Sequence, residues 1–211
     1  MSNVPATADA LMRISPVIPV LTVERAEDAA PLAQALVAGG LPVLEVTLRT
    51  PVAIEAIERM IEAAPGAIVG AGTVLNAADY ERAAKAGAKF IVSPGLTQPL
   101  LEASRQYALP LLAGIATASD LMRGLDAGLD RFKFFPAENV GGPAAIKALG
   151  GPFGDVRFCP TGGVTAQNAP AYLALPNVLC VGGGWVAPSD AIKAGDWGRI
   201  TALAKAAAAL A

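Results

Sequence analysis

The segment DRFKFFP, residues 130–136, places Lys133 among phenylalanines, where an ammonium group is costly unless it is paired or gives up its proton. A lysine amine held uncharged attacks a ketone and forms a protonated imine, which accepts the electron pair of a breaking carbon–carbon bond. The sequence contains no histidine, so proton transfer falls to carboxylates, lysine, tyrosine or cysteine. Glu45, in LPVLEVTLRT at residues 41–50, is the candidate carboxylate. The pair predicts Schiff-base chemistry without a histidine.

Alternation along strands predicts which of these side chains meet. Side chains of a β-strand point alternately to opposite faces, so Glu45 and Arg49 lie on the face opposite Leu44, Val46 and Leu48. By the same count Lys133 and Phe135 share one face, and Thr161 points inward from the next strand. An arginine at such a site grips a carboxylate with two hydrogen bonds, which would favour a 2-keto acid.

Each of these residues also has a purely structural interpretation. Lys133 and Glu45 could form a buried ion pair that only fixes the interior of the fold. Arg49 could cap a helix or pair with a surface acid, and Thr161 could bond a neighbouring backbone group. Their shared placement at strand ends favours a catalytic site.

Two glycine turns come late in the chain, TGG at residues 161–163 and GGG at residues 182–184. Glycines after strands can simply permit tight turns. In a barrel, however, the loops after the seventh and eighth strands commonly hold a phosphate through backbone N–H groups. Their joint position after two neighbouring strands favours the phosphate interpretation.

The order of apolar runs predicts the elements that position these residues. Eight strand candidates cover residues 17–21, 41–48, 67–72, 89–95, 109–114, 130–136, 156–163 and 177–184. Alanine- and leucine-rich helical segments lie between them, with glycine stops at Gly39, Gly87 and Gly128. Spacing of roughly 20 to 25 residues fits one strand plus one helix. The pattern predicts an α/β chain, a single (β/α)8 TIM barrel domain over residues 1–211 with a short N-terminal helix. A doubly wound open sheet is disfavoured because the first strand is not followed by a glycine fingerprint.

Composition limits the partners. The net charge is −2, with 54% hydrophobic and 16% charged residues and no clustering of basic side chains, so neither nucleic acid nor an anionic membrane is expected. The N-terminal residues show no signal-peptide pattern, and a cytoplasmic location is expected. Cys159 and Cys180 lie in apolar runs and are expected to be reduced core residues.

Seven runs carry a family resemblance: EVTLRTP, VGAGTVLN, SPGLT, GIAT, FKFFPAE, RFCPTGG and VGGGW. From about residue 14 to the C-terminus the sequence resembles the 2-keto-3-deoxy-6-phosphogluconate (KDPG) aldolases, the class I aldolases of the Entner–Doudoroff pathway. The resemblance implies reversible cleavage of that substrate to pyruvate and D-glyceraldehyde 3-phosphate, and activity on 4-hydroxy-2-oxoglutarate. It also implies a homotrimer with no metal and no organic cofactor.

The resemblance assigns a role to each matching position. Lys133 would form the Schiff base, and Glu45 would be the general acid–base. The keto-acid end and the pocket would be served by Arg49, Thr73, Pro94, Phe135 and Thr161, the last of which would influence stereochemistry. The phosphate would be bound by Gly162, Gly163, Gly183 and Gly184.

One position departs from the family pattern. Gly184 stands in GGGW where GGSW is expected, so it lacks a hydroxyl that would bond the phosphate, although backbone donors remain. Two other functions stay open. One is an aldolase that prefers the galactonate epimer or 4-hydroxy-2-oxoglutarate, and the other is a phosphosugar-binding barrel without turnover.

Overall fold

The fold is built on eight parallel strands, as the sequence predicts. The computed structural model describes residues 7–210, so the ends of the predicted domain, residues 1–6 and 211, lie outside it. The strands are β1 Val17–Leu21, β2 Val43–Thr47, β3 Ile68–Gly72, β4 Ile91–Val92, β5 Leu111–Ile115, β6 Arg131–Phe134, β7 Arg157–Pro160 and β8 Val181–Gly183. Seven of them fall within one of the eight predicted runs, and β5 extends one residue beyond its run, to Ile115.

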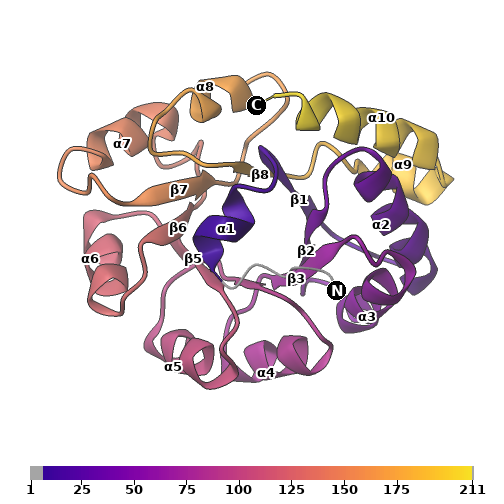
Figure 1. Cartoon of the computed structure of the whole chain (residues 1–211), viewed down its shortest axis with the longest axis horizontal. Helices are drawn as coiled ribbons and strands as arrows, with labels where there is room; N and C mark the ends of the chain where they lie inside the picture. Colours follow the sequence, from indigo (N-terminus) through magenta and orange to yellow (C-terminus); the bar gives the residue numbers. More distant parts are fainter. Residues whose placement is uncertain (1–6, 211) are drawn as a thin grey trace.

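The strands pair in sequence order and form a barrel (Figure 1). β8 returns to β1 with Val17 opposite Val181, so the first and last strands are neighbours. Between β7 and β8 the pairing is reduced to two isolated bridges, Phe158 with Val178 and Thr161 with Gly182. The nearly closed (β/α)8 barrel confirms the predicted fold class.

Helices surround the barrel (Figure 1). Their bounds are α1 Ala8–Met12, η1 Ala26–Asp28, α2 Ala29–Ala38, α3 Ala53–Ala63, α4 Ala77–Lys85, α5 Gln98–Tyr107, α6 Ala118–Asp126, α7 Gly142–Leu149, α8 Ala169–Leu173, α9 Ser189–Ala194 and α10 Trp197–Ala208. Local signals explain several ends: the Thr117 hydroxyl and Asp120 form a capping box at the start of α6. Gly87 and Gly128 take left-handed backbone conformations just after α4 and α6.

Two hydrophobic clusters stabilise the fold. The larger lies between the strands and the outer helices and includes Phe132 and Phe134, which confirms that these rings face the helices. The smaller fills the barrel and contains buried side chains from six strands or their flanks together with Leu11 and Met12 of α1. Burial of apolar side chains on both faces accounts for the near-continuous apolar composition of the strands.

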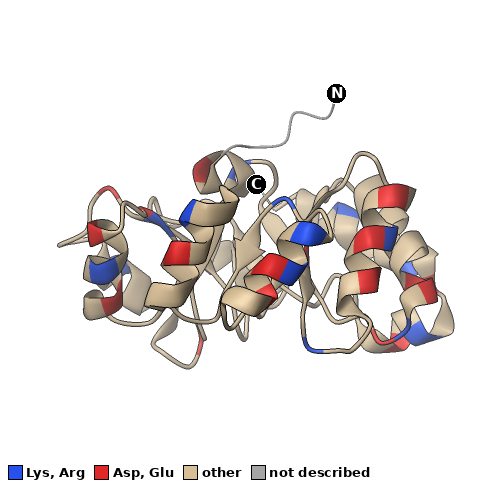
Figure 2. Ribbon diagram, turned by 90° about the horizontal axis from the view of Figure 1, so that it is seen from below, with Lys and Arg blue, Asp and Glu red and all other residues tan. Residues whose placement is uncertain are grey.

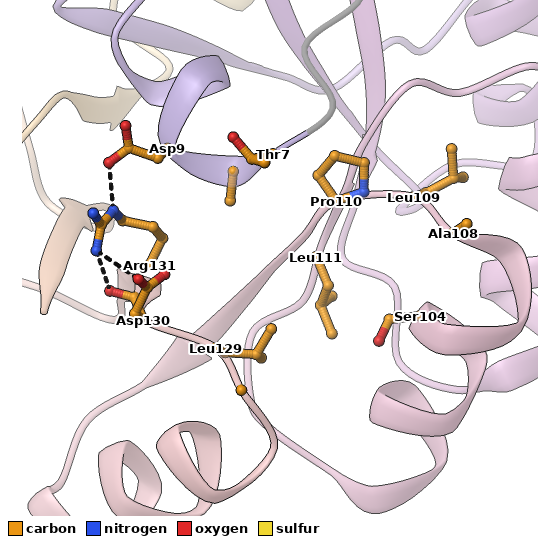
Figure 3. A pocket seen from close by; sticks show the side chains of 12 residues that line it. Thr7, Asp9, Ser104, Ala108, Leu109, Pro110, Leu111, Leu129, Asp130 and Arg131 are labelled. Carbon is orange, nitrogen blue, oxygen red and sulfur yellow. Dashed lines mark hydrogen bonds and ion pairs between the residues drawn. The ribbon is translucent and has the colours of Figure 1, made fainter.

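The short helix α1 closes one end of the barrel, where it lies over the centre of the strand ring (Figure 1). Its Asp9 carboxylate accepts a hydrogen bond from Arg131 Nε at 2.5 Å and one from Arg13 Nε at 2.7 Å. Arg131 is the first residue of β6, so α1 covers the end at which the strands begin. A cavity of about 430 Å³ borders this ion pair (Figure 3).

Replacing Asp9 with asparagine should lower the free energy of unfolding by about 1 kcal/mol at pH 7, because the change weakens two ion pairs that hold α1. The hydrogen bond from Arg13 lowers the pKa of Asp9; burial opposes this, and the hydrogen bond from Arg131 reinforces it. Since the pKa of Asp9 is lower in the folded state than in the unfolded state, the stabilisation is complete above about pH 4 and disappears as pH falls through the folded-state pKa.

Urea unfolding of the wild type and of Asp9→Asn, measured from pH 7 to pH 2, tests this pH dependence. The difference from wild type should vanish at low pH, and Asp126→Asn, at an exposed carboxylate outside any ion pair in residues 7–210, should show no comparable loss.

Acidic and basic side chains are interspersed on the outer helices (Figure 2). Several pair within one helix, such as Arg59 with Glu55 at 2.7 Å in α3. Across residues 7–210, no helix has both the length and the apolar character needed to cross a bilayer. Cys159 and Cys180 are free and buried, as predicted. A hydrogen bond with Cys159, together with burial, raises the pKa of Cys180 well above its usual range, so its thiol stays protonated.

Candidate active site

The predicted lysine and glutamate meet inside the barrel. Lys133 Nζ on β6 donates a hydrogen bond to Glu45 Oε1 on β2 over 3.2 Å, although 88 residues separate them in sequence. Both side chains are almost fully enclosed, with 5% and 3% of their surface exposed. An ion pair this well buried is costly to desolvate, so stability alone is a weak reason for its presence.

A neighbouring glycine makes room for the carboxylate. Gly72 is the last residue of β3, and a Cβ atom placed there would lie 2.2 Å from Glu45 Oε1. Any larger residue would therefore displace Glu45 from Lys133. The lack of a side chain at Gly72 is thus a requirement of the pair.

Lys133 lies against a cavity of about 360 Å³ at the carboxyl ends of the strands. The cavity is lined by residues of β1, β6 and β8, by residues of the loops that follow β1, β2, β6, β7 and β8, and by two residues of α9. They are Val20, Thr22, Arg49, Lys133, Phe135, Thr161, Gly162, Gly163, Val164, Gly182, Gly183, Gly184, Ala187, Pro188, Ser189 and Ile192. Eight of the eleven predicted site residues are therefore in this set.

Arg49 and Phe135 give the cavity a charged and an apolar side. The Phe135 ring centroid lies 5.2 Å from Lys133 Nζ, within the range of a cation–π contact. Arg49 follows β2, is exposed to the cavity, and forms no ion pair with other residues in the range 7–210. Its guanidinium is thus available to an anionic ligand.

Glu45, Thr73 and Pro94 are the predicted site residues outside that lining. Glu45 lies beside Lys133, as described above. Thr73 directly follows β3 and has a left-handed backbone with φ of 56°, a conformation that costs a threonine energy and is concentrated at functional sites. The backbone of Pro94 lies 2.3 Å from where a Cβ of Gly114 would be, and Gly114 is paired in register with Lys133. The ligand-binding roles of Thr73 and Pro94 remain predictions.

The two glycine turns lie side by side at the rim. The bridge between Thr161 and Gly182 joins the end of β7 to β8, so the TGG and GGG segments border the same cavity. Gly162 and Gly163 have φ of 98° and 77°, which turns the chain sharply after β7. Consecutive backbone N–H groups in such a loop form a concavity suited to an anion.

Sequence reasoning missed the contribution of β1 and of the segment after β8. Ile18 points into the barrel, so alternation along β1 also points Val20 and Thr22 inward. The same alternation in the sequence could have identified these two residues. The Thr22 hydroxyl lies 3.2 Å from that of Thr47. Ala187 and Pro188 follow the GGG turn in a loop, where side-chain direction has no periodic signal, and Ser189 is the first residue of α9.

Within residues 7–210, no three of the Asp, Glu and Cys side chains cluster in a way that could hold a metal ion. The fold and the buried pair together define the class of protein: a (β/α)8 barrel with the groups of an imine-forming lyase at the carboxyl ends of its strands.

Comparison with known proteins agrees with this class. The sequence profile of the KDPG and KHG aldolase family matches residues 8–203. A 2-dehydro-3-deoxy-phosphogluconate aldolase from Zymomonas mobilis is 58% identical over 95% of each chain. A KHG/KDPG aldolase from Escherichia coli is 53% identical over 98% of this chain and 97% of its own.

A solved structure of KDPG aldolase from Legionella pneumophila, with pyruvate captured as a covalent carbinolamine, superimposes with a TM-score of 0.92. It is 50% identical and covers 94% of this chain and 97% of its own. The chain belongs to the KDPG and KHG aldolase family.

Proposed function

We propose that this protein is a class I aldolase that cleaves 2-keto-3-deoxy-6-phosphogluconate reversibly to pyruvate and D-glyceraldehyde 3-phosphate. The observation that carries the proposal is the 3.2 Å contact between Lys133 Nζ and Glu45 Oε1, enclosed beside a cavity rimmed by two glycine turns. The carbinolamine of the Legionella relative supports a covalent lysine route in the family.

The reaction begins when Glu45 takes a proton from Lys133 and the free amine attacks the 2-keto carbon. Glu45 then returns the proton to the carbinolamine hydroxyl, which leaves as water, and a protonated imine remains. The buried setting of both groups excludes bulk water that would compete for these protons.

Cleavage follows from the imine. Glu45, directly or through a water molecule, removes the proton of the 4-hydroxyl group, and the bond between carbons 3 and 4 breaks. The electron pair of that bond forms the carbon 2–carbon 3 double bond of an enamine on Lys133, the π pair of the imine moves to its nitrogen, and glyceraldehyde 3-phosphate departs. Protonation of the enamine carbon and hydrolysis of the imine then release pyruvate and restore the lysine amine.

Positioning falls to the residues around the pair. Arg49, exposed to the cavity, would grip the carboxylate of the keto acid, assisted by Thr73, with Pro94 and Phe135 lining the pocket. Thr161 would meet the hydroxylated carbons. The phosphate would be bound by backbone groups of Gly162, Gly163, Gly183 and Gly184.

The direct test is a coupled assay in which released pyruvate oxidises NADH through lactate dehydrogenase. We expect cleavage of 2-keto-3-deoxy-6-phosphogluconate with a higher kcat/KM than its galactonate epimer, and slower cleavage of 4-hydroxy-2-oxoglutarate. The similarity to the 2-dehydro-3-deoxy-phosphogluconate aldolase of Zymomonas mobilis and to the KHG/KDPG aldolase of Escherichia coli supports this order. If none of the three substrates releases pyruvate, the aldolase assignment is refuted.

Several further properties belong to the same proposal. The chain acts as one domain over residues 1–211, works in the cytoplasm without metal or organic cofactor, and binds neither nucleic acid nor membrane. It assembles as a homotrimer, so light scattering should give three times the chain mass of 21.3 kDa. Activity should survive dialysis against EDTA.

Replacing Gly184 with serine should lower KM for the phosphorylated substrate by up to about tenfold, since a hydroxyl adds one hydrogen bond to the phosphate. The site admits the side chain: the backbone is not left-handed, and an added Cβ lies 3.4 Å from the Val20 carbonyl oxygen, an ordinary contact. Steady-state kinetics measures the change. KM for unphosphorylated 4-hydroxy-2-oxoglutarate serves as the control and should stay constant; a parallel fall for both substrates would contradict the phosphate contact.

A further inference from the structure

The loop after β7 is held from behind by hydrogen bonds to its carbonyl groups. The N–H of Ala137 donates to the carbonyl oxygen of Thr161 at 2.8 Å, and that of Glu138 donates to Gly162 at 3.1 Å. Neither donor lines the site cavity, whereas Thr161, Gly162 and Gly163 do. The loop therefore turns its carbonyls toward the chain that follows β6.

The carbonyl of Gly163, the third in this loop, accepts its hydrogen bond from a side chain instead of a backbone N–H. Asn168 Nδ2 donates to the Gly163 carbonyl oxygen at 3.1 Å, while its Oδ1 accepts the N–H of Thr165 at 2.7 Å. Both ends of the amide group are thus engaged, which fixes its orientation. Asn168 does not line the site cavity.

The hydrogen bonds to the loop carbonyls also determine where the N–H groups of the same peptide units point. The C=O and N–H of a trans peptide point in opposite directions, so an Asn168 bond to the Gly163 carbonyl points the Val164 N–H away from Asn168. Gly163 and Val164 both line the cavity. No acceptor among residues 7–210 receives the N–H of either residue.

Close packing leaves this loop little freedom to turn otherwise. A Cβ on Gly163 would lie 2.7 Å from Cβ of Glu138, whose carboxylate in turn accepts a hydrogen bond from the buried Tyr172 hydroxyl. The left-handed φ of 77° at Gly163 is therefore supported from outside the site. The amide directions are set before any ligand arrives.

We infer that Asn168 is a positioning residue for the phosphate end of the substrate, and that the Val164 N–H, which it orients, is a phosphate donor adjacent to that of Gly163. The inference rests on the proposed function and adds two residues to its phosphate site. Successive backbone N–H groups in such a loop can bind an anion without any charged side chain.

Asn168→Asp is the sharpest test, because aspartate keeps the acceptor for Thr165 and replaces only the donor to Gly163. Two oxygens then face each other, and the peptide between Gly163 and Val164 should rotate. We expect KM for 2-keto-3-deoxy-6-phosphogluconate to rise about tenfold or more, as for loss of a hydrogen bond to a charged group, with little change in kcat. KM and kcat for 4-hydroxy-2-oxoglutarate, which has no phosphate, should not change.

Two variants separate positioning from other effects. Asn168→Ala removes the donor without adding charge and should give the same substrate-selective rise. Gln167→Glu adds a negative charge at the adjacent exposed residue and should leave both KM values near wild type. An equal effect of Asn168→Ala on both substrates would show that Asn168 only stabilises the loop, and a KM rise in Gln167→Glu matching Asn168→Asp would show that charge alone acts. Either result overturns the inference, whereas a wild-type protein that cleaves neither substrate overturns the proposed function instead.

Discussion

Lys133→Arg should reduce kcat for cleavage by about three orders of magnitude or more, as expected when a covalent nucleophile is removed. Arginine keeps a positive charge beside Glu45, with which Lys133 is paired at 3.2 Å, but its guanidinium does not form an imine with a ketone. The decisive measurement is trapping: incubation with pyruvate and borohydride, followed by peptide mass spectrometry. Wild type should carry a reduced adduct on the peptide containing Lys133, and the variant should carry none.

The matched control is Lys147→Arg, the same substitution at an exposed lysine of α7. It should retain full activity and the adduct on Lys133. Thermal unfolding of both variants checks that the barrel remains folded. An adduct on another lysine in wild type, or undiminished turnover in Lys133→Arg, would refute the assignment of Lys133.

Glu45→Gln should lower kcat by about 10²- to 10⁴-fold, the usual range for loss of a general acid–base group. Glutamine retains an oxygen that can accept the Lys133 hydrogen bond, so the amine stays in place while proton transfer is lost. Borohydride trapping should still label Lys133, but more slowly, because expulsion of water from the carbinolamine has lost its acid. Stopped-flow measurement of cleavage and timed trapping together give both rates.

Glu62→Gln, at an exposed carboxylate of α3, provides the control and should match wild type. Glu45→Asp should recover part of the activity, since it restores a carboxylate at greater distance from Lys133. A Glu45→Gln enzyme that turns over at the wild-type rate would instead leave the carboxylate with only a structural role.

Strand positions and strand faces were predictable from sequence. Each apolar run produced a strand, because parallel strands buried on both sides need nearly continuous apolar residues. Alternation correctly put Glu45 and Lys133 inside and Phe132 and Phe134 outside. Strict periodicity of two makes this inference reliable even without knowledge of neighbours.

The distances within the site were not predictable. Glu45 and Lys133 come together only because β2 and β6 both direct side chains into the interior of the same barrel. The space for the carboxylate depends on Gly72 of a third strand. Loops carry no such period, so the backbone of Thr73 and the lining role of Ala187 could be found only in three dimensions. The Asn168 contact with Gly163 is likewise invisible in sequence, since nothing distinguishes that asparagine from a turn residue.

The closure of one barrel end by α1 has a kinetic consequence. With Leu11 and Met12 filling the base and Lys133 buried above them, substrate and both products share a single route at the carboxyl ends of the strands. In the proposed reaction the three carbons of pyruvate stay covalently bound to Lys133 until the imine is hydrolysed, after the phosphorylated fragment has been cleaved off. Release is therefore ordered, aldehyde first and pyruvate last, so pyruvate should inhibit competitively against the keto acid and glyceraldehyde 3-phosphate noncompetitively. In the synthetic direction pyruvate must load before the aldehyde.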